Sequence, residues 1–395
     1  MLTFPAKGHV EKLRSYMAEQ GIDVCLLSSP ENMEYFSGFQ AITYTRPIRF
    51  IVTQDETHLI VPALEEDHAS TKAVVTDHLH IYYEHPPKAV ENPGAFAILK
   101  EILTKKAGAL CGIEANALSY KQAEMLKDWG LHLKDCSPYL TKIRAIKDEY
   151  EKDCIREAGR LCCYAMGVSL EHARPGISEL EFEQYGTTAL YDLISGDDYP
   201  YVFSSPTCFT PSGVERTNMP HVFSGLRQFK DGDMVIHVRK PAINGYHGEL
   251  ERTFCIGKPS EEVKRAFSAM VEAQMAVLDA IRPGVTSREM DSLARSVLKK
   301  YGYEEYAIHR CGHGQGLGRH EEPFLIFDSD LVLEENMVFT VEPGIYIPAV
   351  GGFRHSDTLI LTKDGYENTT DFKRLPEECW RVAGRQRSSR NSESL

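Results

Sequence analysis

The chain has 395 residues, of which 42% are hydrophobic and 26% are charged, the usual balance of a soluble globular protein. Its formal net charge of −13 provides no basic surface for nucleic acid or for an anionic membrane. No apolar run reaches the roughly 18 residues that a transmembrane helix needs. The length exceeds that of one typical domain, so we expect two domains.

The ten cysteines show no Cys-x-x-Cys spacing, and the first seven residues lack the charged and apolar segments of a secretory leader. A long chain without such a leader more often keeps its cysteines reduced in the core. We therefore expect free thiols and a cytoplasmic location.

The first part of the chain alternates helical and strand patterns. A short amphipathic helix ends at Gly21, and Ser29 and Pro30 have the residue types of an N-cap and a first helical position. The predicted elements here are a helix over 12–17, a strand over 23–27, and a strand pair over 50–52 and 58–61. These patterns predict an α/β domain over residues 1–143.

A long helix opens the second domain, which we place at 144–384. Asp148 is its expected N-cap, and Glu151 can reach back to the N-cap amide. Apolar residues then recur at helical spacing until the Arg-Pro-Gly stop at 174–176. The tail over 385–395 contains almost no apolar residues and is predicted to be disordered.

The second domain contains an internal repeat. Residues 174–181 match 282–289, and each segment reads as a helix stop, a Pro-Gly turn and a Ser or Thr that caps a new helix. Residues 231–238 match 334–341 in the same order. Two copies of helix, turn, helix and strand predict a domain with pseudo-twofold symmetry.

The segment 245–254 reads as a strand with two acidic residues. Side chains alternate along a strand, so Glu249 and Glu251 share one face and Leu250 points away. Two carboxylates are costly to bury without partners. Either this face is solvated, with Arg252 nearby, or it binds a cation such as a metal ion, an ammonium or a guanidinium.

Four blocks, at 245–254, 311–323, 341–344 and 353–357, together resemble the creatinase, Xaa-Pro peptidase and methionine aminopeptidase superfamily. The resemblance implies an α+β protein, in which a small α/β domain precedes a pita-bread catalytic domain with helices behind a curved antiparallel sheet. It also implies an active site between the two halves of that catalytic domain.

The metallopeptidases of this superfamily carry Asp, Asp, His, Glu and Glu around two metal ions. The matching positions in this chain are Val238, Glu249, His313, Glu342 and Ser356. Valine and serine cannot replace bridging carboxylates, so the resemblance favours the metal-free creatinase branch, with no metal ligand and no cofactor.

By this resemblance, His221 is the general base that activates water and returns the proton to the leaving nitrogen, a role that suits an imidazole at neutral pH. Glu251 and Glu342 hold a substrate guanidinium through charge-assisted hydrogen bonds. His313 and His320 line the pocket and complete the catalytic set.

Four further residues are assigned to substrate binding by the same resemblance. Tyr44 and Arg46 match an aromatic residue and an arginine that hold the substrate in creatinase-like proteins, and Glu249 is a further contact. Phe324 stands where creatinase has a second carboxylate-binding arginine, which argues against creatine itself. The resemblance also implies a homodimer, in which Tyr44 and Arg46 complete the neighbour's active site.

Three functions remain open from the sequence. The leading hypothesis is a metal-independent hydrolase of a C–N bond in a small guanidino, amidine or amide substrate. The first alternative is an Xaa-Pro dipeptidase with one Mn, Fe or Zn ion on Glu249, His313 and Glu342. The second alternative is a non-catalytic member that binds a peptide or a protein partner.

Overall fold

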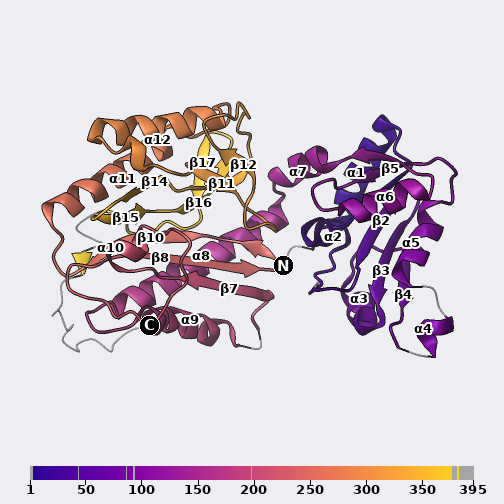
Figure 1. The fold of residues 1–395 in the computed structure, drawn as a ribbon, viewed down its shortest axis with the longest axis horizontal. Helices are drawn as coiled ribbons and strands as arrows, with labels where there is room; N and C mark the ends of the chain where they lie inside the picture. The colour runs from indigo at the N-terminus through magenta and orange to yellow at the C-terminus, as the bar shows by residue number, and fades with distance from the viewer. Residues whose placement is uncertain are drawn as a thin grey trace. The chain divides into compact units, whose positions relative to one another are not determined.

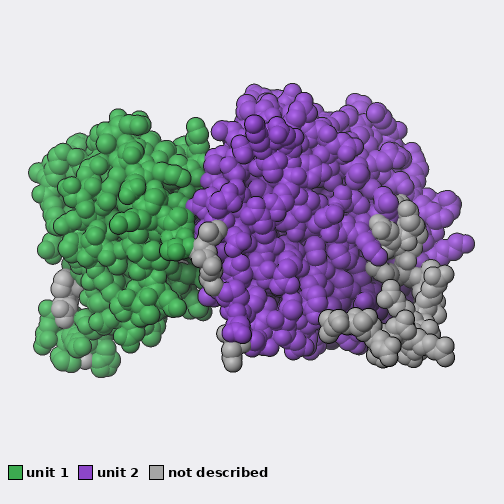
Figure 2. Space-filling model, turned by 180° about the vertical axis from the view of Figure 1, so that it is seen from behind, with its two compact units in different colours: residues 1–144 green, residues 145–395 purple. Residues whose placement is uncertain are grey.

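The computed structural model describes residues 3–42, 44–85, 87–91, 94–196 and 198–375, together with the backbone of 380–381. The chain divides into two compact units, Met1–Arg144 and Ala145–Leu395 (Figure 2). The tail predicted to be disordered, 385–395, lies outside the described residues. Among the helices that are described, none has the length and apolar character to cross a membrane.

Unit 1 is built on a six-stranded sheet with the order β4-β3-β2-β1-β5-β6 (Figure 1). Its strands are β1 (Val24–Leu27), β2 (Arg49–Thr53), β3 (Thr57–Pro62), β4 (His78–Tyr82), β5 (Leu110–Ile113) and β6 (His132–Asp135). Strand β2 runs antiparallel to β1 and β3, and the other neighbours are parallel. Strands β4 and β6 are therefore the edges of the sheet.

The helices of unit 1 are α1 (Ala6–Gln20), α2 (Pro30–Ser37), α3 (Glu66–Lys72), α4 (Lys88–Glu91), α5 (Ala95–Leu103), α6 (Tyr120–Asp128) and α7 (Ser137–Ala145). The end of α1 and the start of α2 have the residue types that the sequence indicated. Gly21 ends α1 with φ of 66°, a left-handed conformation that glycine adopts without a Cβ clash. Ser29 caps α2 by accepting a hydrogen bond from the amide of Asn32.

Unit 2 contains two main sheets and a hairpin, backed by pairs of helices (Figure 1). The first sheet has the order β18-β10-β8-β7, with strands β7 (Phe203–Phe209), β8 (Met234–Ile243), β10 (Leu250–Ile256) and β18 (Trp380–Arg381), and β9 (Tyr246–His247) pairs with β8. The second has the order β12-β11-β13-β16-β17, with strands β11 (Gly312–Gly314), β12 (Glu321–Leu325), β13 (Val338–Val341), β16 (Asp357–Thr362) and β17 (Gly365–Asn368). The hairpin is β14 (Gly344–Ile347) and β15 (Gly351–Arg354).

The helices of unit 2 repeat with the sheets. They are α8 (Glu149–Glu171), α9 (Glu179–Ile194), the short α10 (Gly213–Thr217), α11 (Glu261–Ala280) and α12 (Ser287–Tyr301). The predicted capping box joins Asp148 and Glu151 at the start of α8. Helices α8 and α9 pack together on the first sheet, and α11 and α12 pack together in the second half.

The internal repeat recurs in the backbone pairing. Ser178 caps α9 and forms an antiparallel bridge with Gln228, while Thr286 caps α12 and forms the equivalent bridge with Val332. Each half thus ties the start of its second helix to the segment before its next strand. The predicted fold class, an α/β domain followed by a pseudo-twofold catalytic domain, is confirmed.

The two halves of unit 2 meet at β10. Glu251 is paired with Val238 of β8 on one side, and its backbone forms an antiparallel bridge with Ser356 on the other side. Leu250 points the opposite way into the apolar core, as the strand alternation predicted. The acidic face of β10 is therefore held at the seam between the halves.

Candidate active site

A pocket of about 320 Å³ opens on this seam in unit 2. The side chains that line it come from both halves and are mostly polar. They are Thr207, Phe209, His221, Val238, Lys240, Glu249, Glu251, His313, Arg319, His320, Glu342 and Arg354. The pocket brings together all five residues for which the sequence predicted a catalytic role, together with Glu249.

Three buried donors converge at the base of the pocket. The Nε2 atom of His313 lies 3.5 Å from Oε1 of Glu342 and 3.8 Å from Oε2 of Glu249. The three ligand atoms of this set all lie within 4.8 Å of one another. Nδ1 of His313 lies 3.0 Å from the carbonyl oxygen of Gly314. A proton on Nδ1 donates to that carbonyl, so the lone pair of Nε2 faces the two carboxylates.

The electrostatics of this triad call for a proton or a cation among its donors. Burial lowers the pKa of His313 to about 3, so its ring is neutral at neutral pH. Burial and the neighbouring carboxylates of Glu249 and Glu251 raise the pKa of Glu342 well above its usual value. A lone pair and two carboxylates that face one another without a proton between them repel, unless positive charge lies among them.

Lys240 supplies part of that positive charge, and the sequence reasoning missed it. Its ammonium forms an ion pair with Glu249, and both side chains are almost fully buried. Despite the burial of Glu249, this neighbour lowers the pKa of its carboxyl group. Lys240 lies two residues after Val238 on β8, so strand alternation from Val238 was the signal that could have placed it in the pocket.

Glu251 is already occupied by a guanidinium of the protein. Arg354, at the end of β15, donates from Nη2 to Oε1 of Glu251 over 2.9 Å and from Nε to the other oxygen. Its Nη1 donates to the hydroxyl of Tyr346 over 2.9 Å. Because a bidentate arginine uses both carboxylate oxygens, Glu251 is not free to take a guanidinium from a substrate.

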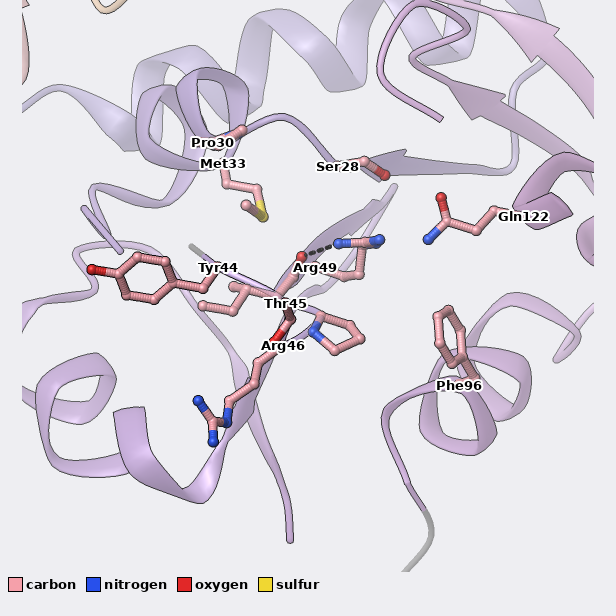
Figure 3. A pocket seen from close by; sticks show the side chains of 11 residues that line it. Ser28, Pro30, Met33, Tyr44, Thr45, Arg46, Arg49, Phe96 and Gln122 are labelled. Atoms are coloured by element: carbon pink, nitrogen blue, oxygen red, sulfur yellow. Dashed lines mark hydrogen bonds between the residues drawn. The ribbon is translucent and has the colours of Figure 1, made fainter. Parts of the chain in front are cut away.

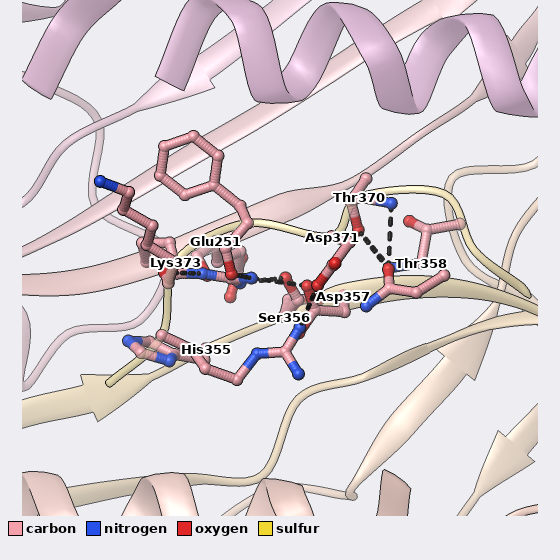
Figure 4. Close-up of polar contacts among 12 residues, drawn as sticks. Glu251, His355, Ser356, Asp357, Thr358, Thr370, Asp371 and Lys373 are labelled. Atoms are coloured by element: carbon pink, nitrogen blue, oxygen red, sulfur yellow. Dashed lines mark hydrogen bonds and ion pairs between the residues drawn. The ribbon is translucent and has the colours of Figure 1, made fainter. Parts of the chain in front are cut away.

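A buried polar network behind the pocket fixes β10 against β16 (Figure 4). Arg252 donates to Oδ1 of Asp357 over 2.6 Å and to the carbonyl oxygen of Lys373 over 2.8 Å. The hydroxyl of Thr358 donates to the carbonyl of Glu249 over 2.8 Å and accepts from its amide over 2.9 Å. The bonds to Thr358 hold the backbone of Glu249, and the amide of Glu251 donates to the carbonyl oxygen of Ser356 over 3.1 Å, so the backbone that carries both carboxylates is fixed.

Two histidines stand nearer the mouth of the pocket. The ring of His320 stacks on that of His313 with centroids 3.8 Å apart, and its Nδ1 lies 3.5 Å from Nη2 of Arg310. Arginine can only donate, so the proton of His320 belongs on Nε2. Burial and the charge of Lys240 lower the pKa of His320 to about 4. Burial and the charge of Arg354 also lower the pKa of His221.

The remaining predicted residues lie elsewhere. Tyr44 and Arg46 line a different pocket of about 360 Å³ in unit 1 (Figure 3). The Tyr44 side chain is 84% exposed, and Arg46 forms an ion pair of 2.5 Å with Glu84. Phe324 is not among the residues that line the pocket of unit 2, and Arg310 lies over its ring at 4.2 Å. A substrate role for these three residues stays a prediction.

The donors fit one metal ion but not two. Val238 offers no ligand atom, and Ser356 offers only a neutral hydroxyl, which is buried without a hydrogen-bond partner among the described residues. Glu249, His313 and Glu342 supply two carboxylates and one imidazole in the tautomer that binds metal. This set suits a single Mn, Fe or Zn ion with open coordination positions.

Comparison with known proteins assigns both units to described families. Residues 9–146 match the creatinase/prolidase N-terminal domain, and residues 153–363 match metallopeptidase family M24. The Xaa-Pro dipeptidase of Pyrococcus furiosus is 32% identical over 373 residues, which cover 93% of this chain and 99% of the relative. The Xaa-Pro dipeptidase of Lactobacillus delbrueckii subsp. lactis is 30% identical, with 93% and 99% covered.

Solved structures agree with these relatives. The prolidase from Pyrococcus furiosus matches with a TM-score of 0.78 at 30% identity, and the match covers 91% of this chain and all of that one. The Xaa-Pro dipeptidase from Bacillus anthracis matches with a TM-score of 0.79 at 29% identity, covering 94% of this chain and 99% of the other.

The predicted metal-free, creatinase-like hydrolase without a cofactor is wrong. The superfamily was identified correctly, but the relatives are Xaa-Pro dipeptidases and the matching family is one of metallopeptidases. The structure supplies two physical reasons. Arg354 already fills the carboxylate that was expected to bind a substrate guanidinium. The two lost carboxylates, at Val238 and Ser356, do not affect Glu249, His313 and Glu342, whose ligand atoms still converge.

Proposed function

Because the chain belongs to metallopeptidase family M24, we propose that it is a metal-dependent dipeptidase that cleaves Xaa-Pro substrates with a single ion held by Glu249, His313 and Glu342. The observation that carries this proposal is the convergence of three buried donors, one imidazole and two carboxyl groups, on one point of the pocket. The proposal departs from the usual two-ion site of the family because Val238 and Ser356 remove two of its ligands.

When bound, the ion would polarise the scissile carbonyl as a Lewis acid, which contributes several kcal/mol to the reaction. The side chains around it account for the rest of the chemistry. His221, whose pKa is lowered, is neutral and able to accept the proton of the attacking water and return it to the prolyl nitrogen. The Nε2 proton of His320 is available as a donor to the oxygen that gains negative charge.

The rest of the pocket suits a small peptide with a free carboxylate. Its volume of about 320 Å³ lies at the lower end of ligand pockets, which fits a dipeptide. Arg319 lines the pocket and is exposed, so its guanidinium is available to the free carboxylate of the substrate. Phe209 and Val238 form an apolar wall, which we assign to the prolyl ring.

The test is hydrolysis of Leu-Pro and Met-Pro by protein that has been stripped of metal and reloaded with Mn²⁺. We expect free proline to be released, activity to be lost with a chelator and restored by Mn²⁺, and about one ion to be bound per chain. Creatine, assayed for urea, should not react. Turnover of Xaa-Pro peptides by protein free of metal would contradict the proposal, and so would one bound ion per chain without any peptide cleavage.

Two finer predictions accompany this function. The homodimer is testable by light scattering, and the role of Arg46 by an Arg46→Ala variant, which should lower kcat without changing the metal content. If the Arg46→Ala variant is a dimer with unchanged kinetics, Arg46 does not contribute to the active site of the neighbouring subunit. The cytoplasmic location likewise stays a prediction from the sequence.

A further inference from the structure

A second cluster of histidines lies in unit 1, on the edge of its sheet. His58 of β3 is directly opposite His78 of the edge strand β4 in their parallel register, and His80 lies two residues further along β4. Glu56 lies two residues before His58. Because residues two apart on a strand share a face, the three histidines project from the same face of the sheet, and Glu56 lies directly before the start of β3 beside them.

The ligand atoms of three of these residues converge. Nε2 of His58 lies 3.6 Å from Oε2 of Glu56, and Nε2 of His78 lies 3.3 Å from Oε1 of the same carboxylate. All three ligand atoms lie within 4.8 Å of one another. The spacing therefore requires only small side-chain rotations to reach the 2.0–2.2 Å ligand distances typical of zinc.

The protonation of His58 leaves a lone pair for a ligand. His58 is 2% exposed, and its Nδ1 lies 3.1 Å from Nε2 of His80. Its Nε2 is buried and has no hydrogen-bond partner among the described residues. In the tautomer that donates the Nδ1 proton to His80, the buried Nε2 keeps its lone pair and lies next to Glu56.

A buried imidazole nitrogen without a partner, beside a carboxylate and a second imidazole, is the arrangement of a transition-metal site. We propose that Glu56, His58 and His78 bind a divalent ion of the zinc class, and that His80 is the positioning residue that fixes the tautomer of His58. The side chains of Glu56 and His78 are each 46% exposed, so the ion can enter from solvent and keep a water in its fourth position.

The ion joins the edge strand β4 to β3 through side chains. An edge strand presents unpaired backbone groups and is held from one side only. A bond through metal between His58 and His78 adds a cross-link at the register pair itself. Lys105, whose ammonium lies 3.9 Å from Oε2 of Glu56, competes weakly for the same carboxylate.

The experiment is equilibrium dialysis of the full chain against micromolar ZnCl₂, with elemental analysis, in a His313→Ala background that disables the site in unit 2. We expect about one zinc per chain. The His78→Ala change should remove it, and His132→Ala, which alters an exposed histidine on the opposite edge strand β6, should leave it in place. Cobalt in place of zinc should give the intense visible absorption of a four-coordinate ion.

A second variant shows whether zinc binding is lost because a ligand is removed or because unit 1 unfolds. His78 and Glu56 are half-exposed, so neither His78→Ala nor Glu56→Gln should unfold unit 1, and circular dichroism checks this. Both variants should lose zinc, whereas Lys105→Ala should bind it a few-fold more tightly. Zinc binding that survives both His78→Ala and Glu56→Gln, or no binding at ten micromolar zinc, would overturn the site. Neither result bears on peptide cleavage in unit 2.

Discussion

The two histidine–carboxylate clusters differ in how much of their charge the protein itself neutralises. In unit 2, Glu249 is paired with a buried lysine and Glu251 with a buried arginine, so a pocket full of carboxylates carries its own cations. In unit 1, Glu56 is half-exposed and lies near two imidazoles, and the ammonium of Lys105 is 3.9 Å from its carboxylate, so water and salt do most of the screening. The two clusters have similar ligand atoms but differ in burial. Burial therefore decides how strongly the charge of each cluster depends on a bound cation.

The sharpest test of this contrast is the removal of an imidazole ligand from the buried site. His313→Ala should lower kcat/KM for Leu-Pro by about 10³-fold, because it removes a ligand of the ion whose Lewis-acid contribution is worth several kcal/mol. The bound manganese should fall together with the activity. His132→Ala, on the surface of unit 1, is the control. Full manganese binding in the His313→Ala variant would remove this residue from the ligand set.

The buried arginine is the next largest effect. Arg354→Met leaves the Glu251 carboxylate buried without its bidentate partner, which should cost about 3–5 kcal/mol of unfolding free energy. Urea denaturation of the full chain measures this, and the double variant Arg354→Met with Glu251→Gln should recover much of the loss. A loss of unfolding free energy below about 1 kcal/mol would mean that water reaches Glu251, although this residue is buried in the structure.

Lys240 tests whether an internal cation competes with a metal. Lys240→Met removes the ammonium from Glu249, so the affinity for Mn²⁺ should rise about tenfold, which is ~1.4 kcal/mol. Calorimetric titration measures the change, and Lys300→Met, an exposed lysine on α12, serves as the matched control. An affinity that falls in Lys240→Met would show instead that the ammonium organises the ligands.

The last prediction concerns a partly buried acid of unit 1, Glu34, and its effect on stability accumulates only as the pH rises. Burial raises the pKa of Glu34 to about 8, so the folded protein keeps it neutral while the unfolded chain ionises it above about 4.5. Its contribution to stability is complete below the unfolded pKa and is lost as pH rises towards 8, at up to about 1.4 kcal/mol per pH unit. Glu34→Gln should flatten the slope between pH 5 and pH 8 in urea denaturation, and the exposed Glu19→Gln should not.

The sequence predicted the fold well because fold depends on local patterns. The caps at Ser29 and Asp148, the left-handed Gly21 and the repeat around Ser178 and Thr286 are each decided within a few residues. Alternation along the segment 245–254 likewise predicted that Glu249 and Glu251 share one face, and both line the pocket.

The chemistry of the site was predicted less well because it depends on partners far apart in the chain. Glu251 and Arg354 are separated by 103 positions, and Lys240 reaches Glu249 only because β8 and β10 pair. The sequence argument considered each metal-ligand position of the motif separately and gave most weight to the two lost carboxylates. It could not show that the other three donors converge closely enough to bind one ion. The histidines of unit 1 were missed because no motif links positions on two different strands.

Arg354 has one further consequence. The pocket contains, covalently attached to its own backbone, the chemical group that its carboxylate would otherwise capture from solution. The side chain of Arg354 therefore prevents a free guanidinium from binding to Glu251. An Arg354→Ala variant would open a cavity whose shape and charge match a guanidinium ion. Added guanidinium at millimolar concentration should then refill the vacancy and restore the stability of that variant, while leaving the unaltered protein unaffected. The presence of the Arg354 guanidinium beside Glu251 thus decides whether this pocket can bind a free guanidinium.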